Sequence, residues 1–568
     1  MAETRIKIVS LSSLHRVFPD YCPENNEIKT FSALRNEPFS FQFAYKLESE
    51  NYQKRPFYLR IESDLPMNAY SVGYVPVTHS EKIQDDLKRG PGLYPDMLIP
   101  KLINAPIDVE KDYWSSFWFE RGEKNNLMAY DDCWQSLWLN INEDGKKIPA
   151  GKFSVNIKFY SRMGNTLFAD ETVEIEIIDS VLPKQKFYNT SWFHCDCLAD
   201  IYNVEVFSDR FFEIFESFAQ SAAKNGMNMI FLPAFTPPLD TPIGTERMTV
   251  QLVGVEYKNR KYSFDFSLMK RYIDICRRVG IEYFEHNHLF TQWGATSAPK
   301  IVATVNGKEK RIFGWDTDAT DKKYIDFLHA YIAELAEFLK QEKLEKKILF
   351  HISDEPDIKN ASGYINAKKE LGGCLSKYMC GDAMSEYTFY ENKMVDIPIV
   401  SIAKLEDFVG RCDDMWCYYT CSSRGKKRTN RLVINSSEVN RIFGVLMYYF
   451  KVKGFLHWGF NYYYDMLSHG LFNPSVRPDG YYGRPGASYL VYPELDGTAI
   501  QSVRQKVFYD AINDIRALQL LEKLYDRKTV ENLIENCFGE ITIDTLPESP
   551  EIMLSFRNKV NEMIKESI

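Results

Sequence analysis

Eight short apolar segments alternate with segments of helical periodicity through the last two-thirds of the chain, and this alternation constrains the fold more than any other feature. Strands separated by helices pair in parallel through right-handed crossovers. Eight such units in a row are typical of a (β/α)8 barrel of the TIM type. The predicted strands are residues 187–195, 227–234, 281–290, 347–353, 377–381, 397–403, 415–421 and 454–460, and the predicted helices are 210–225, 267–279, 322–342, 361–371, 437–451 and 502–524.

The first third of the chain follows a different pattern, without a useful stretch of helical periodicity. Short alternating or β-branched runs are separated by turn-forming residues such as Arg89-Gly90-Pro91-Gly92, which favours a β-sandwich. We therefore predict a multidomain chain of all-β and α/β parts. The predicted domains are an N-terminal β-sandwich over 1–183, the catalytic barrel over 184–525, and a C-terminal helical tail over 526–568 packed on the barrel.

Composition excludes several classes of partner. The formal net charge of -9 argues against nucleic acid and against an anionic membrane surface. No apolar run approaches the length of a transmembrane helix, and the first residues lack a signal-peptide pattern. The 11 cysteines are scattered and match no zinc-module spacing, which suits reduced thiols. We expect a cytoplasmic protein without metal or cofactor. The sequence is compatible with a homo-oligomer and does not decide the oligomeric state.

The strongest chemical signal is the segment Phe350-His351-Ile352-Ser353-Asp354-Glu355-Pro356. A buried strand ends there in two adjacent carboxylates, and Pro356 cannot continue the interior of a sheet. Barrel enzymes keep their catalytic groups at the carboxyl ends of the strands. We therefore predict that Asp354 and Glu355 are catalytic.

Imidazole and aromatic side chains collect at the ends of the other predicted strands. Such a mixture suits a neutral, ring-shaped, polar substrate, namely a sugar, because aromatic faces stack on sugar rings and polar groups bond its hydroxyls. Some of these residues could instead fill the barrel core. The predicted substrate-binding residues are His194, His286, His351, Trp416, Tyr418, Tyr419, Trp458 and Asn461.

A metal hydrolase is an alternative interpretation of the same strand ends. His286 and His288 are two residues apart, so a continuous strand would place both imidazoles on one side. Asp354 or His194 could then complete a metal shell. We favour the metal-free site, because no second histidine pair accompanies the first.

The adjacency of the two acids selects among glycosidase mechanisms. Two-carboxylate glycosidases hold their acids ~5 to 9 Å apart on opposite sides of the scissile bond, and neighbouring residues rarely meet that condition. Adjacent acids better suit a mechanism in which the substrate's own 2-acetamido group attacks the anomeric carbon. In that hypothesis Asp354 orients and stabilises the acetamide, and Glu355 is the general acid/base. The alternatives are a glycosidase using Glu355 with a distant acid, Glu285 or Asp382, and a glycan-binding protein without catalysis.

The segment His351–Pro356 resembles the catalytic strand of glycoside hydrolase family 123, the β-N-acetylgalactosaminidases. The run from Gly454 to Asn461 is similar to that family's last barrel strand. The segments Leu490-Val491-Tyr492-Pro493, Asp496-Gly497 and Ser502-Val503-Arg504, followed by Asp510 to Asp514, resemble the uncharacterised domain that accompanies the barrel in these proteins. The resemblance implies retaining hydrolysis of a glycan or glycoconjugate carrying a β-linked N-acetylhexosamine, foremost N-acetylgalactosamine, with the same roles for Asp354 and Glu355.

Overall fold

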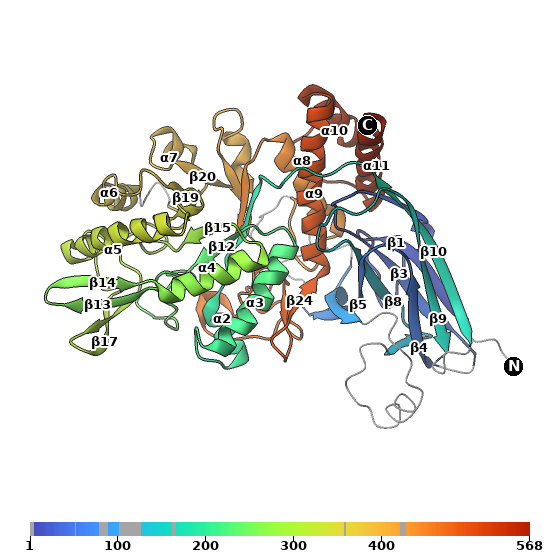
Figure 1. Ribbon diagram of the computed structural model, residues 1–568, viewed down its shortest axis with the longest axis horizontal. Helices are drawn as coiled ribbons and strands as arrows, with labels where there is room; N and C mark the ends of the chain where they lie inside the picture. Colours follow the sequence, from blue (N-terminus) through green and yellow to red (C-terminus); the bar gives the residue numbers. More distant parts are fainter. Residues whose placement is uncertain are drawn as a thin grey trace.

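The computed structural model describes residues 5–50, 53–78, 89–101, 126–161, 166–356, 359, 361–420 and 428–568. A β-rich N-terminal region and a barrel surrounded by helices lie side by side, and the long helix α9 (Val503–Leu524) stands between them (Figure 1). Among the helices formed by the described residues, none combines the length and the apolarity needed to cross a bilayer.

The predicted barrel is confirmed: eight parallel strands close on themselves in chain order. Most observed strands are shorter than predicted, because the polar residues at their ends already belong to loops. Cys421, the end of the seventh predicted strand, lies outside the described residues. The strands are β11 (Tyr188–Ser191), β12 (Met229–Leu232), β15 (Tyr283–His286), β18 (Ile348–Phe350), β19 (Met379–Met384), β20 (Ile397–Ser401), β21 (Trp416–Tyr418) and β22 (Gly454–His457).

The predicted helices follow the strands with nearly the predicted bounds, because each has an apolar face that packs on the barrel. Shorter elements were not predicted, as their few residues show no periodicity. The helices of this part are α2 (Cys195–Tyr202), α3 (Asp209–Lys224), α4 (Ser267–Val279), α5 (Lys322–Gln341), α6 (Ala361–Leu371), α7 (Tyr387–Glu391) and α8 (Ser437–Tyr449), with 3-10 turns η3 (Ile402–Asp407) and η4 (Met466–Ser468).

The N-terminal region consists of two sheets that share one hydrophobic core. Side chains of one sheet, such as Phe41 and Leu139, belong to the same buried cluster as Ile157 and Val173 of the other. The β-sandwich over 1–183 stays a prediction. The elements are β1 (Arg5–Ser12), η1 (Glu24–Asn26), β2 (Thr30–Leu34), β3 (Phe39–Glu48), β4 (Lys54–Glu62), β5 (Met67–Val77), β6 (Gly92–Lys101), β7 (Asn126–Tyr130), β8 (Gln135–Ile141), β9 (Gly151–Ser161) and β10 (Leu167–Ile178).

The sequence did not reveal that the two parts share a sheet. The strands β23 (Tyr492–Pro493) and β24 (Ala499–Ser502), which fall within the predicted barrel span, extend the first N-terminal sheet through the pairing of β24 with β6. A buried ion pair beside this junction joins Arg504 Nε to Asp96 Oδ2 at 3.0 Å. A two-residue strand carries no periodic signal, so only the folded chain identifies this junction.

A separate four-stranded sheet is built from the long connections after β12 and β15. Its strands are β13 (Gly254–Lys258), β14 (Lys261–Asp265), β16 (Ile301–Val305) and β17 (Lys308–Phe313), ordered β14-β13-β16-β17. Phe264 packs edge-on against Phe327 of α5, which fixes this inserted sheet on the helix layer. It lies at the end of the molecule farthest from the N-terminal sheets (Figure 1).

The C-terminal helices α10 (Arg527–Phe538) and α11 (Pro550–Glu566) pack on α9. Arg557 of α11 pairs with Asp514 of α9 at 2.7 Å and with Glu37 of the N-terminal region at 2.7 Å. The tail therefore contacts the junction of the two regions as well as the helix layer of the barrel.

Candidate active site

Asp354 and Glu355 lie directly after β18, at the mouth of the barrel. Asp354 is half-buried and Glu355 is exposed. The backbone N–H of Trp293 donates to the carbonyl of Asp354 at 2.9 Å, and the Ser353 hydroxyl donates to the carbonyl of Thr291 at 2.8 Å. The loops after β15 and β18 are thus bonded together where the carboxylates emerge.

Glu355 has a left-handed backbone conformation, with φ of 44°. For a residue with a Cβ atom this conformation costs about 1–2 kcal/mol. Such strain persists only where the surrounding structure imposes it, and it is frequent at catalytic positions. The strained turn presents the Glu355 side chain to solvent beside that of Asp354.

The two acids influence each other and are held by Tyr418. Burial and the negative charge of Glu355 raise the pKa of Asp354 well above its usual range. The Tyr418 hydroxyl, at the end of β21, donates to Glu355 Oε1 at 2.6 Å. Burial and the neighbouring Glu355 raise the pKa of Tyr418, so this phenol remains a hydrogen-bond donor. Tyr418, predicted as a binding residue, therefore positions one of the two predicted catalytic acids.

Beneath the mouth, Glu285 is fully buried inside the barrel. It accepts hydrogen bonds from the Thr190 hydroxyl at 2.7 Å, from His351 Nε2 at 2.7 Å, and from the Trp192 indole. A buried carboxylate needs such donors, because burial without them strongly disfavours the charged form. Glu285 is therefore fixed inside the barrel by three hydrogen bonds.

His351 lies between two carboxylates. Its Nε2 bonds Glu285, and its Nδ1 lies 3.4 Å from Oδ1 of Asp382. Burial alone would lower the pKa of His351, but the two carboxylates outweigh it and raise the pKa to about 10. Asp382 in turn accepts from the Ile352 backbone N–H at 3.0 Å and from the Tyr364 hydroxyl at 2.6 Å. Glu285, His351 and Asp382 thus form a buried charge network one layer below Asp354.

His194, Trp458 and Asn461 come together at another part of the mouth. Asn461 accepts from the backbone N–H of His194 at 2.8 Å and donates to its carbonyl at 3.1 Å. The ring Nε2 of His194 bonds the Trp458 carbonyl at 2.9 Å, and burial lowers the pKa of His194 to about 4. Trp458 is half-buried over the barrel core, so it can contact a substrate, whereas Asn461 is buried and fixes the backbone.

The structure places three predicted binding residues away from the mouth. His286 bonds Tyr331 of α5 and stacks on Phe350, between the barrel and its helices. Trp416, the first residue of β21, stacks on Tyr188 with 4.8 Å between ring centroids, in the floor of the barrel. Tyr419 points outward and packs on Phe443 and Phe455 of the helix side. All three are buried, and their neighbours are protein side chains.

The predicted arrangement of His286 and His288 on one side of a strand is wrong. β15 ends at His286, and within it Glu285 faces inward while His286 faces the helices. The chain then turns, and His288 lies inside the barrel, its ring 4.6 Å from that of His351.

Among the described residues, one cluster brings metal-type ligands together: His288, His351 and Asp382, with ligand atoms within 4.8 Å of one another. A metal needs a neutral imidazole, whereas the carboxylates beside His351 favour its charged form. The cluster is therefore better described as a charge network that contains its own cation.

Sequence reasoning missed the side chains that organise the mouth from below and from the side. Thr190 and Trp192 alternate along the first strand with the period that turns both inward, and this signal could have been read. Asp240 could not have been found, because it lies in a long connection. It accepts hydrogen bonds from Tyr462 and from Tyr481, two residues of the loop after β22.

Comparisons with known proteins agree with this fold. The family model described as glycoside hydrolase 123, catalytic domain, matches residues 192–521. The structure is similar to a family 123 glycoside hydrolase from Clostridium perfringens that was analysed for glycolipid glycan hydrolysis, with a TM-score of 0.68 and 13% identity over 99% of this chain and 98% of that one. No curated protein matches the sequence significantly.

Two further solved structures show a weaker likeness to this chain. A family 5 mannosidase from Rhizomucor miehei gives a TM-score of 0.32 at 12% identity, over 59% of this chain and 94% of that one. A β-glucuronidase from Ruminococcus gnavus gives a TM-score of 0.29 at 9% identity, over 90% of this chain and 69% of that one.

The catalytic-domain model matches more than half of the chain. Together with the parallel barrel and the adjacent carboxylates at its mouth, this match makes the chain a glycoside hydrolase. It belongs to glycoside hydrolase family 123.

Proposed function

We propose that this enzyme releases a β-linked N-acetylhexosamine, with N-acetylgalactosamine as the first candidate, by a retaining, substrate-assisted mechanism without metal. The observation that carries the proposal is the adjacency of Asp354 and Glu355 after β18, in a strained turn that exposes Glu355. Two neighbouring acids act on one side of the sugar, so the substrate itself must supply the nucleophile.

In the first step the acetamide oxygen attacks the anomeric carbon while the bond to the leaving oxygen breaks. Glu355 gives its proton to that oxygen, and Asp354 orients the acetamide and balances the positive charge of the oxazolinium ring. In the second step Glu355 takes a proton from water, which attacks the anomeric carbon and reopens the ring. The sugar leaves with its original configuration, and Glu355 is protonated again.

The raised pKa of Asp354 is compatible with these two steps when substrate binding transfers the proton from Asp354 to Glu355. In the free enzyme, burial and the charge of Glu355 favour a protonated Asp354. An acetamide N–H donated to Asp354 favours its ionised form, so the proton of the pair passes to Glu355, where a donor is required. Tyr418 occupies only Oε1 of Glu355, which leaves Oε2 for the proton.

The surroundings of the other acids argue against the two-sided mechanism. Glu285 is buried and accepts from three donors, and Asp382 accepts from Tyr364 and from Ile352 N–H. Neither carboxylate reaches the mouth as a free nucleophile. Because the similar enzyme from Clostridium perfringens was analysed for glycolipid glycan hydrolysis, glycolipid glycans ending in N-acetylgalactosamine are the first natural substrates to test.

The test compares aryl β-glycosides that differ only at the 2-position. We expect cleavage of the 2-acetamido galactoside, a rate at least about 10³-fold lower for the 2-hydroxy analogue, and strong inhibition by a thiazoline that mimics the oxazoline. Release of the β-anomer as the first product, followed by NMR, checks retention. Equal rates on the two glycosides together with indifference to the thiazoline would reject acetamide participation.

A further inference from the structure

A hollow lies beside the mouth of the barrel, between the loop after β12 and the loop after β22. Its volume is about 480 Å³, within the range of roughly 300–1,000 Å³ typical of small-molecule sites. Residues after β11, Asp196 and Asp200, complete its wall. All three walls are connections at the carboxyl ends of barrel strands, so the hollow lies on the same face as Asp354 and Glu355.

The lining combines fixed charge with ring and alkyl surface. Arg247 is ion-paired with the buried Asp196 at 2.6 Å, and its guanidinium lies 5.8 Å from the ring centroid of Tyr464. Met248 and Leu471, which also line the hollow, are 38% and 44% exposed. Asp196 and the Leu239 carbonyl hold the guanidinium of Arg247, whereas the exposed side chains of Thr245 and His469 in the same lining can bond hydroxyls. Such groups beside surfaces that pack against C–H faces are the combination that a neutral sugar requires.

The wall on the side of β22 is held in a conformation that the chain does not favour by itself. Leu467 and Ser468 are consecutive left-handed residues, with φ of 60° and 57°. Asp240 fixes both: its carboxylate accepts from Leu467 N–H at 3.0 Å, and its carbonyl accepts from the Ser468 hydroxyl at 2.7 Å. A strained loop kept in place by a loop from another strand is typical of a preformed binding surface.

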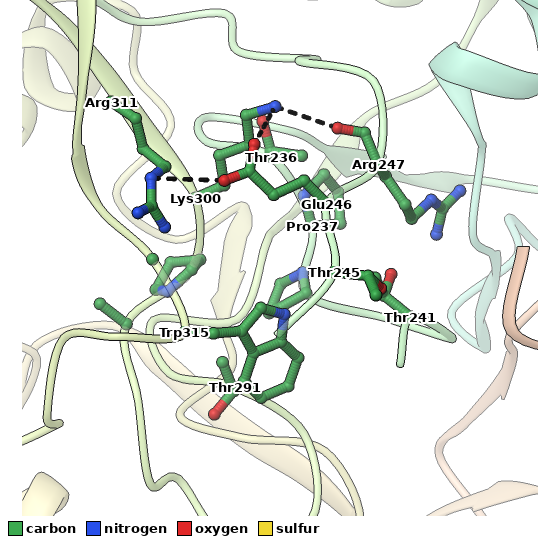
Figure 2. Close-up of a pocket in the computed structure, with 14 residues that line it drawn as sticks. Thr236, Pro237, Thr241, Thr245, Glu246, Arg247, Thr291, Lys300, Arg311 and Trp315 are labelled. Carbon is green, nitrogen blue, oxygen red and sulfur yellow. Dashed lines mark hydrogen bonds and ion pairs between the residues drawn. The ribbon is translucent and has the colours of Figure 1, made fainter. Parts of the chain in front are cut away.

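The wall on the side of β12 is supported from behind by the inserted sheet (Figure 2). Lys300 bonds the Arg247 carbonyl at 3.1 Å and Glu246 at 3.0 Å, and Arg311 lies 3.3 Å from the same carboxylate. The space behind this loop is only about 20 Å³, which is water-sized. The loop is therefore braced on one face and open to the 480 Å³ hollow on the other.

The hollow is connected to the catalytic acids through short contacts. Thr241, in its lining, accepts from Gln292 Nε2 at 3.4 Å, and the next residue, Trp293, donates to the carbonyl of Asp354 at 2.9 Å. On the other side, Tyr462 lies 5.2 Å from Trp458 at the mouth and 5.4 Å from Arg247. Tyr462 is buried, so one side chain separates Trp458 from Arg247, and the mouth and the hollow are neighbours.

We propose that this hollow, between Arg247 and Tyr464, binds a neutral sugar on the leaving-group side of the bond that is cleaved. The proposal rests on the proposed function, because it assumes that the released sugar occupies the mouth beside Asp354. A sugar released from the end of a glycan is joined to the rest only through the bond that breaks. A hollow next to the mouth therefore receives the remainder of the glycan.

The test fills the hollow and compares a long with a short substrate. Thr245 is exposed and lines the hollow, so Thr245→Trp places an indole in it. Ile243 belongs to the same loop, is 77% exposed and does not line the hollow, so Ile243→Trp is the matched control. The substrates are an aryl β-N-acetylgalactosaminide and a trisaccharide with the same terminal sugar on lactose.

We expect the wild type to prefer the trisaccharide in kcat/KM. Thr245→Trp should reduce the ratio of kcat/KM between trisaccharide and aryl glycoside at least 10-fold, whereas Ile243→Trp should keep the wild-type ratio. Calorimetry with lactose alone, on a Glu355→Gln background, should show binding that Thr245→Trp weakens at least 10-fold.

An unchanged ratio in Thr245→Trp, or the same loss of ratio in Ile243→Trp, would overturn the proposal. If the wild type cleaved neither substrate, the proposed function would fail. The lactose titration alone would then decide whether the hollow binds a neutral sugar. Lactose binding lost in Thr245→Trp but kept in Ile243→Trp would then support a sugar site, and no binding to any variant would reject it.

Discussion

Two pairs of carboxylates lie one above the other in this barrel, and their surroundings differ. Glu285 and Asp382, in the lower pair, are buried and accept hydrogen bonds or an ion pair from His351, Trp192, Tyr364 and neighbouring groups. In the upper pair, Glu355 is exposed with Tyr418 on Oε1, and Asp354 is half-buried. The contrast indicates that hydrogen-bond saturation, rather than residue type, separates the acids that hold the barrel from the acids that we propose to act on a substrate.

The sharpest way to break this comparison is to neutralise one acid of the upper pair. Glu355→Gln should lower kcat on an aryl β-N-acetylgalactosaminide by about 10²–10⁴-fold, because it removes the proposed general acid/base. Since Glu355 is exposed, the melting temperature should stay close to that of the wild type, which calorimetry checks. Near-normal turnover would refute the assigned role.

The same substitution in the lower pair should mainly lower stability, whereas in the upper pair it should mainly lower kcat. Glu285→Gln leaves His351 charged and partly unpaired in the barrel, and breaking a buried ion pair costs about 3–5 kcal/mol. Urea unfolding should therefore show a free energy of unfolding lowered by about that amount. A Glu285→Gln variant that is stable but inactive would instead assign Glu285 a role in the reaction. The lower and upper pairs of acids would then not differ in function.

The pH dependence of stability tests the cation of the lower pair. The folded-state pKa of His351 is raised from 6.5 to about 10. Its contribution to stability is therefore complete below pH 6.5 and is lost as the pH rises toward 10. In that window the wild-type free energy of unfolding should fall by up to about 1.4 kcal/mol per pH unit more steeply than that of His351→Gln. Parallel curves for the two proteins would show that His351 is neutral in the folded state.

The smallest expected effect concerns the contact that joins the mouth to β21. Tyr418→Phe removes one hydrogen bond to Glu355, so we expect a loss in kcat of about 10-fold, equivalent to about 1.4 kcal/mol. Steady-state kinetics on the aryl β-N-acetylgalactosaminide measures this loss. Trp416→Phe, in the barrel floor, is the control and should leave kcat unchanged.

The sequence predicted the barrel well and its mouth only in part. Strand and helix periodicities report which faces are buried, and burial positions the eight units. Period-two reasoning failed where a strand ended early: His286 was expected at the mouth, but β15 stops there and the ring faces α5. It also assigned Trp416 to a strand end, whereas Trp416 begins β21 and fills the floor.

The loops around the mouth could not be derived from local patterns. The contacts of Asp240 with Tyr462 and Tyr481 join residues more than 200 positions apart, and no periodicity encodes such pairings. The two acids were predicted to be catalytic because a proline-terminated strand is a local signal, and that role stays a prediction. Their roles depend on neighbours such as Tyr418, which only the closed barrel brings within reach.

The pairing of β24 with β6 has a consequence for anyone who divides this protein. A cut after residue 183 would remove β6 and leave β24 as an unpaired edge, ready to pair with another chain. The same cut would leave the buried Arg504 without its carboxylate partner Asp96. The isolated barrel should therefore aggregate when expressed alone, and co-expression of 1–183 as a separate chain should restore its solubility.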